Sequence, residues 1–112
     1  ESDLDVVTAL SGSGPAYVFY FLEAMTEAGV KMGLPEAQAY HLAKATFAGA
    51  THLARQSTES PEVLRQRVTS KGGTTYAALT SMADDHVKEA FVKAMLAAQK
   101  RAGELGDEFG KD

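Results

Sequence analysis

The stretch PAYVFYFLEAM, residues 15–25, decides the fold of this 112-residue chain. Four aromatic residues lie between positions 17 and 21, and the apolar run continues until Glu23. Such a stretch has no polar stripe, and a helix that is apolar on every side is normally a buried helix. The sequence therefore predicts a long helix here that other elements must cover.

A second predicted helix, over residues 36–56, is also apolar on more sides than a surface helix. Its apolar residues are Ala37, Ala39, Tyr40, Leu42, Ala43, Ala45, Phe47, Ala48, Ala50, Leu53 and Ala54. A domain of this size covers only about 60 to 70% of its chain surface, which is too little to bury two such helices. A second copy would supply the cover, and the many alanines and glycines would let helices approach closely.

We therefore expect an all-α helical bundle that forms an intertwined homodimer. Its shared core would bury Phe19, Tyr40, Phe47 and Leu53. The alternative is a compact monomeric bundle.

Helix start and stop signals divide the whole chain into helices, with no convincing strand, internal repeat or linker. The expected helices span residues 3–10, 15–32, 36–56, 61–68, 75–82 and 85–105. Gly33 is placed to end the second helix and Pro35 to begin the third. Ser60 is expected to cap the fourth helix and Asp84 the last one. The pattern predicts a single domain over residues 1–112.

Composition excludes several classes of function. The chain has eleven basic and fifteen acidic residues, a net charge of −4, and no cluster of Lys and Arg. This balance argues against nucleic acid or an acidic membrane as a partner. There is no cysteine, which excludes a thiol nucleophile and is compatible with the cytoplasm. The longest apolar run, residues 16–22, is far shorter than the roughly 20 residues that span a bilayer.

Metal and dinucleotide sites are also not expected. His41 and His52 share a helix face, but eleven helical residues separate them by about 16 Å, too far to ligate one metal ion. Residues 84–86, Asp-Asp-His, are better explained by helix capping. The stretch GSGPAY resembles a dinucleotide fingerprint, but Tyr17 replaces the third glycine and no strand precedes the stretch. Cofactor-binding residues are therefore unknown.

The stretch TSKGGTT, residues 69–75, stands directly before a predicted helix. One interpretation is a simple helix start, because glycine permits unusual backbone angles and threonine caps free N–H groups. The other is an anion cradle, in which several N–H groups and the helix dipole converge on a negative group. The residues alone leave both interpretations open.

Three motifs together resemble the C-terminal dimerisation domain of pyrroline-5-carboxylate reductase. They are LSGSGPAY at 10–17, GVKMGLP at 29–35 and VTSKGGTTYAAL at 68–79, and the resemblance covers residues 5–104 approximately. It implies a helical domain of the 6-phosphogluconate-dehydrogenase-like reductases, behind an N-terminal nucleotide-binding domain that is absent from this chain. We therefore expect the chain to be a fragment, and expect it to be inactive when isolated.

The family reduces 1-pyrroline-5-carboxylate to L-proline with NADPH or NADH, in the last step of proline biosynthesis. Its helical domains form homodimers, which often assemble into decamers. In the family a Gly-Gly-Thr-Thr loop holds the substrate carboxylate, and a second helix start closes the pocket toward the nicotinamide. The matching substrate-binding residues of this chain are Gly72, Gly73, Thr74, Thr75, Ser13 and Gly14. Thr75 is the candidate catalytic residue, because its hydroxyl could hydrogen-bond the ring nitrogen.

This chain departs from the family at Lys71, where many relatives have proline. A lysine there leaves the loop less constrained but adds attraction for an anion. Two other functions stay open beside the first. The same helical domain could serve a reductase of another imino or oxo acid, or it could be a non-enzymatic dimerisation module. The choice between NADH and NADPH and the identity of the proton donor are not encoded in these residues.

Overall fold

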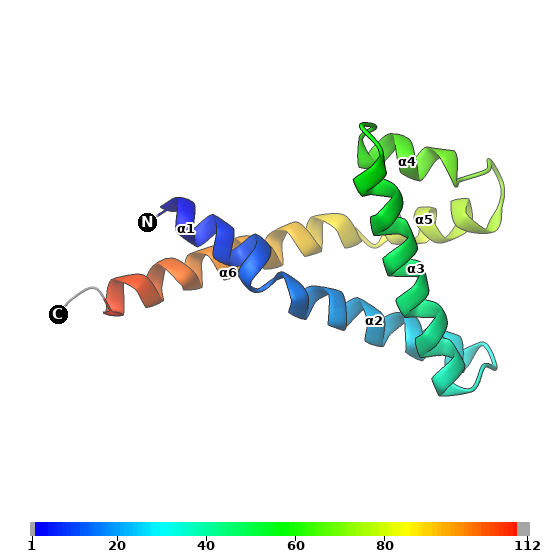
Figure 1. Cartoon of the computed structure of the whole chain (residues 1–112), viewed down its shortest axis with the longest axis horizontal. Helices are drawn as coiled ribbons and strands as arrows, with labels where there is room; N and C mark the ends of the chain where they lie inside the picture. Colours follow the sequence, from blue (N-terminus) through cyan, green and yellow to red (C-terminus); the bar gives the residue numbers. More distant parts are fainter. Residues whose placement is uncertain (1, 110–112) are drawn as a thin grey trace. The chain divides into compact units, whose positions relative to one another are not determined.

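Every regular element in residues 2–109, the part of the chain that the computed structural model describes, is a helix (Figure 1). The prediction of an all-α fold is therefore confirmed. The elements are α1 (Ser2–Val7), the π-helix η1 (Thr8–Gly12), α2 (Gly14–Lys31), α3 (Glu36–Gln56), α4 (Pro61–Arg67), α5 (Thr74–Asp84) and α6 (Val87–Phe109). None of these helices combines the length and apolarity needed to cross a bilayer.

The local signals for helix ends account for several of these boundaries. The Ser60 side chain accepts a hydrogen bond from the Val63 N–H at 3.2 Å, so the predicted cap of α4 is confirmed. Gly33, with φ of +107°, ends α2 in the left-handed conformation that favours glycine. Pro35 lies one residue before α3 instead of inside it, and its carbonyl accepts the Ala39 N–H at 3.0 Å.

The prediction that Asp84 caps the last helix is wrong. Asp84 is the final residue of α5, because that helix runs further than expected and the Asp85 N–H still donates to Ser81 O at 3.1 Å. The chain turns at His86, whose φ is +56°, and the His86 carbonyl then accepts the first bond of α6 from Ala90 N–H. The first helix also differs from its prediction, since α-helical geometry ends at Val7 and continues as the π-helix η1.

The described residues form two compact units. The first contains residues 2–18 and 81–109, and in it α1 and η1 both pack on α6 (Figure 1). Gly103 of α6 lies at this contact, where a Cβ atom would come within 3.2 Å of the Asp5 carboxylate. A small residue on α6 therefore lets α1 lie close to it.

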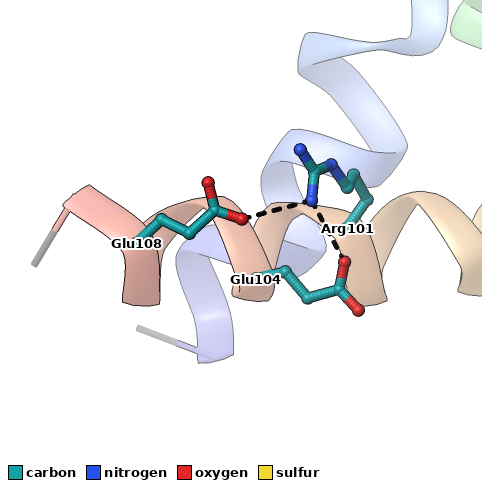
Figure 2. Close-up of polar contacts among 3 residues, drawn as sticks. All are labelled: Arg101, Glu104 and Glu108. Carbon is teal, nitrogen blue, oxygen red and sulfur yellow. Dashed lines mark hydrogen bonds and ion pairs between the residues drawn. The ribbon is translucent and has the colours of Figure 1, made fainter.

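The C-terminal half of α6 carries a small group of exposed charges, shown in Figure 2. Arg101 Nη1 lies 3.2 Å from Glu104 Oε1 and 3.5 Å from Glu108 Oε2, and all three side chains are about half exposed or more. Exposed ion pairs of this kind stabilise a helix by a few tenths of a kcal/mol. This face of α6 therefore suits contact with water.

The second unit, residues 19–80, contains most of α2, all of α3 and α4, and the start of α5. The α2 and α3 helices meet at Gly29 and Ala39, both of which are buried. A Cβ atom on Gly29 would lie only 2.8 Å from the Cβ atom of Ala39. Glycine at this position therefore sets how closely the two helices approach.

We expect Gly29→Ala to lower the melting temperature of the protein. The overlap with Ala39 has to be relieved by moving a helix, at a cost of about 1 to 3 kcal/mol. Removing a glycine from a helix interior returns at most about 1 kcal/mol. The control is Gly106→Ala on α6, where a new Cβ has no neighbour within 4 Å in the described residues, and this variant should melt no lower than the wild type. Thermal melts at one fixed protein concentration compare the two, and a Gly29→Ala variant as stable as the control contradicts the close approach.

The described residues bury very few apolar side chains. They are Ala9, Leu22, Ala39 and Ala43, so a single leucine is the largest of them. Phe19, Tyr40 and Leu53, which we expect in a shared core, are 61%, 44% and 62% exposed in the single chain, and Phe47 is half-buried. One chain therefore leaves uncovered the helix faces that the sequence marks as core.

Candidate functional site

The glycine pair forms a tight turn between α4 and α5. The turn runs from Ser70 to Gly73, and it is closed by a 3.0 Å hydrogen bond from the Gly73 N–H to the Ser70 carbonyl oxygen. Gly72, in its third position, has φ of +75°, which side chains with a Cβ atom rarely adopt. Gly72 is therefore required by the backbone, whatever binds at the loop.

Gly73 has a different role from Gly72. Its carbonyl accepts the Ala77 N–H at 3.0 Å, which is the first hydrogen bond of α5, so Gly73 occupies the N-cap position. A Cβ atom here would come within 3.3 Å of the Ser70 carbonyl oxygen. Because the Gly73 N–H already donates within the turn, the amides left without a helical acceptor are those of residues 74–76. Those three amides, at the positive end of the helix dipole, suit a carboxylate.

The hydroxyls of Thr74 and Thr75 are exposed in the first turn of α5. Some threonine hydroxyls of the described residues donate to the carbonyl four residues earlier, as Thr26 does to Leu22 O and Thr46 to Leu42 O, both at 2.7 Å. The first turn of a helix has no such helical carbonyl behind it, and the structure of residues 2–109 gives the Thr75 hydroxyl no hydrogen bond. Capping by threonine also does not apply here, because a glycine holds the N-cap position. The Thr75 hydroxyl is thus open to a ligand.

Lys71 occupies the second position of the same turn and is exposed. This position favours proline, whose fixed φ matches the turn. The turn is therefore formed with lysine at the position that favours proline. Its shape is held by the positive φ of Gly72 and the bond that closes it.

The second predicted segment, Ser13 and Gly14, stands where η1 ends and α2 begins. The Ser13 N–H donates to Thr8 O at 2.8 Å, and the Ser13 carbonyl accepts the Ala16 N–H at 3.1 Å. Both residues are half-buried. The expectation of a second helix start at this point is confirmed. This segment belongs to the first unit, and the Gly72–Thr75 loop belongs to the second.

The histidine and acidic side chains in the described part of the chain form no metal site, and Tyr17 makes a polar contact near Ser13 and Gly14. Within residues 2–109 no group of three or more His, Asp and Glu side chains could hold a metal ion, and His41, His52 and His86 are exposed. Tyr17 has a polar contact that the sequence does not predict, since its hydroxyl donates to Ala9 O at 2.7 Å across η1. No spacing rule points to this contact, because it depends on the π-helix between the two residues.

Comparison with known proteins gives a consistent result over nearly the whole chain. The family described as pyrroline-5-carboxylate reductase dimerisation matches residues 1–105. Pyrroline-5-carboxylate reductase of Corynebacterium melassecola is 46% identical over 106 residues, which are 95% of this chain and 39% of that protein. Pyrroline-5-carboxylate reductase 2 of Bacillus subtilis is 44% identical over 109 residues, which are 97% of this chain and 39% of that protein.

Solved structures agree with these relatives. The chain matches Plasmodium falciparum pyrroline carboxylate reductase with NADP bound at a TM-score of 0.91 and 34% identity, over 95% of this chain and 40% of that one. It matches a pyrroline-5-carboxylate reductase of Coxiella burnetii at a TM-score of 0.89 and 43% identity, over 94% of this chain and 39% of that one. The chain therefore spans about two fifths of the length of these relatives, and it belongs to the pyrroline-5-carboxylate reductase dimerisation family.

Proposed function

We propose that the protein containing this chain reduces 1-pyrroline-5-carboxylate to L-proline, the last step of proline biosynthesis. In this proposal the helical chain binds the substrate carboxylate and joins two copies of the protein. The observation that carries it is the start of α5, where residues 74–76 offer amides without helical acceptors beside the Thr75 hydroxyl. Family membership supplies the substrate class, because the matched relatives are named pyrroline-5-carboxylate reductases.

In the proposed reaction these residues act through hydrogen bonds and form no covalent bond with the substrate. Charge-assisted hydrogen bonds from the amides of residues 74–76 would hold the substrate carboxylate. The Thr75 hydroxyl would hydrogen-bond the ring nitrogen, which gains a proton as the adjacent imine carbon gains a hydride. Ser13 and Gly14 would serve the same reaction at the start of α2.

The hydride would come from NADPH or NADH, which supplies the reducing chemistry when bound. The described residues do not fit a dinucleotide site of their own, because a strand followed by a glycine-rich turn is required and residues 2–109 contain no strand. We propose that an N-terminal nucleotide-binding domain of the longer protein holds the cofactor. We also propose a cytoplasmic enzyme whose homodimers assemble further, as the decamers of the family do.

The test compares the isolated chain with the full-length protein. Full-length protein should oxidise NADPH or NADH in the presence of 1-pyrroline-5-carboxylate, whereas the isolated chain should not, because it lacks a cofactor site. Circular dichroism of the isolated chain serves as the control, since an inactive chain must still be shown to be helical. Turnover by the purified isolated chain contradicts the proposal.

A panel of substrates separates the remaining alternatives. Cyclic imines and 2-oxo acids are assayed with the full-length protein under the same conditions. Preference for another imino or oxo acid identifies a related reductase. No reduction of any compound by folded full-length protein identifies a non-enzymatic dimerisation module.

A further inference from the structure

Tyr17 joins three elements of the first unit. It lies in the first turn of α2, and its hydroxyl donates to the carbonyl oxygen of Ala9 in η1 at 2.7 Å. Its ring meets the ring of Phe91 on α6 edge to face, with centroids 5.6 Å apart and planes at 89°. The aromatic contact fixes the ring, and the ring places the hydroxyl over η1.

The π-helix explains why Ala9 needs this partner. In a regular α-helix the Ser13 N–H would donate to Ala9 O, four residues earlier. Here the Ser13 N–H donates instead to Thr8 O at 2.8 Å, and so passes over Ala9 O. Ala9 is 4% exposed, so water has little access to its backbone. The Tyr17 hydroxyl therefore supplies the hydrogen bond that the π geometry takes away.

We infer that Tyr17 is a positioning residue for the Ser13–Gly14 segment, an inference that rests on the proposed role of this segment in substrate reduction. The Ser13 N–H is the group that changes partner between the two helix types. Without the tyrosine hydroxyl, Ala9 O regains a hydrogen bond when Ser13 N–H returns to it and η1 becomes α-helical. That change removes the extra residue of the π-turn and rotates the start of α2 by about 100°, the angle per residue of an α-helix. Ser13 and Gly14 would then no longer face the substrate.

The experiment uses Tyr17→Phe in the full-length protein, with Tyr20→Phe as the matched control. Tyr17→Phe removes the hydroxyl and keeps the ring that packs on Phe91. The control makes the same change three residues later, at a side chain that is 67% exposed. We expect amide exchange in residues 8–17 to accelerate in Tyr17→Phe alone, and KM for 1-pyrroline-5-carboxylate to rise roughly tenfold with a smaller change in kcat. The helical signal and the oligomeric state should match the wild type.

Amide exchange and kinetics together distinguish a failure of the Tyr17 inference from a failure of the proposed function. Unchanged exchange in residues 8–17 overturns the inference, because the hydroxyl then does not hold the π-turn. Faster exchange with unchanged KM also overturns it, because the turn then does not serve the site. Wild-type protein that reduces no imine overturns the proposed function, and with it the role of Tyr17. If Tyr17→Phe does not fold, Phe91→Leu carries the same measurements, since it keeps the hydroxyl and removes the ring that holds Tyr17 in place.

Discussion

Thr75→Val in the full-length protein is expected to lower kcat/KM for 1-pyrroline-5-carboxylate by roughly ten- to a hundredfold, or about 1 to 3 kcal/mol. Valine keeps nearly the same volume and removes only the hydroxyl, so a polar group of the bound substrate loses its partner. The melting temperature should hardly change, because the N-cap position of α5 belongs to Gly73 and the described residues give the Thr75 hydroxyl no hydrogen bond to lose.

Thr80→Val is the matched control for this measurement. It places the same substitution on the same helix, at another exposed threonine more than one turn away from the start of α5. Its kcat/KM should equal that of the wild type. If Thr75→Val instead shows a lowered melting temperature and an unchanged kcat/KM, the hydroxyl acts only in the helix start and its proposed catalytic role is wrong.

Gly73→Val should also lower kcat/KM, because it adds a branched side chain beside the amides of residues 74–76. The structure predicts a second effect, since the new Cβ atom would lie 3.3 Å from the Ser70 carbonyl oxygen and press on the turn. Stability is therefore expected to fall as well. Of the two substitutions, Thr75→Val is the cleaner test of binding, and Gly73→Val tests whether the turn keeps its shape.

The second large effect concerns association of the chain with itself. We expect the protein to sediment as a homodimer with no folded monomer at micromolar concentration, and Leu53→Asp to abolish both the dimer and the folded state. In a monomer this substitution would be mild, because Leu53 is 62% exposed and surface changes usually stay within about 0.5 kcal/mol. In a shared core the same aspartate would bury an unpaired charge, which costs far more. The two interpretations thus predict different outcomes for one variant.

The shape of the second unit supports the dimeric interpretation. An open groove between α2 and α3 is lined by Phe19, Leu22, Val30 and Tyr40, with charged side chains among them. Met32→Asp is the control, because Met32 is 79% exposed after the end of α2 and is not among the residues expected in the shared core. Sedimentation and circular dichroism of both variants decide the question. A folded monomer of the wild type, or a Leu53→Asp protein that stays folded, contradicts the obligate dimer.

Much of the helical layout can be predicted from the sequence, because its signals act within one or two turns. The bounds of α3 match the expected 36–56, and Ser60 and Gly33 end or begin helices as predicted. A cap, a proline or a glycine acts on the hydrogen bonds of its immediate neighbours, so a short stretch of sequence contains the whole cause. The family could be recognised for a similar reason, since three short motifs stand in the expected order.

Asp84 shows where local signals fail. An aspartate before a helical run is a good capping signal, but α5 continues through it, and the chain turns only at His86. The glycine pair shows a different limit, because the residues leave open both a helix start and an anion cradle. The structure gives Gly72 a positive φ and uses the Gly73 N–H in a hydrogen bond to Ser70 O. Which amides stay free depends on the turn as formed, and several turns are compatible with the same residues.

The sequence by itself determined the all-helical class, most helix boundaries and the family of this chain, because each depends on neighbouring residues or on short motifs. Only the tertiary structure decided the π-helix at residues 8–12 and the closeness of α2 and α3 at Gly29. At the π-helix the Ala9 carbonyl accepts the hydroxyl of Tyr17, whose ring packs on Phe91 of α6, and the close approach at Gly29 involves Ala39 of another helix. Each involves a contact between different helices, which forms only once those helices have packed against one another.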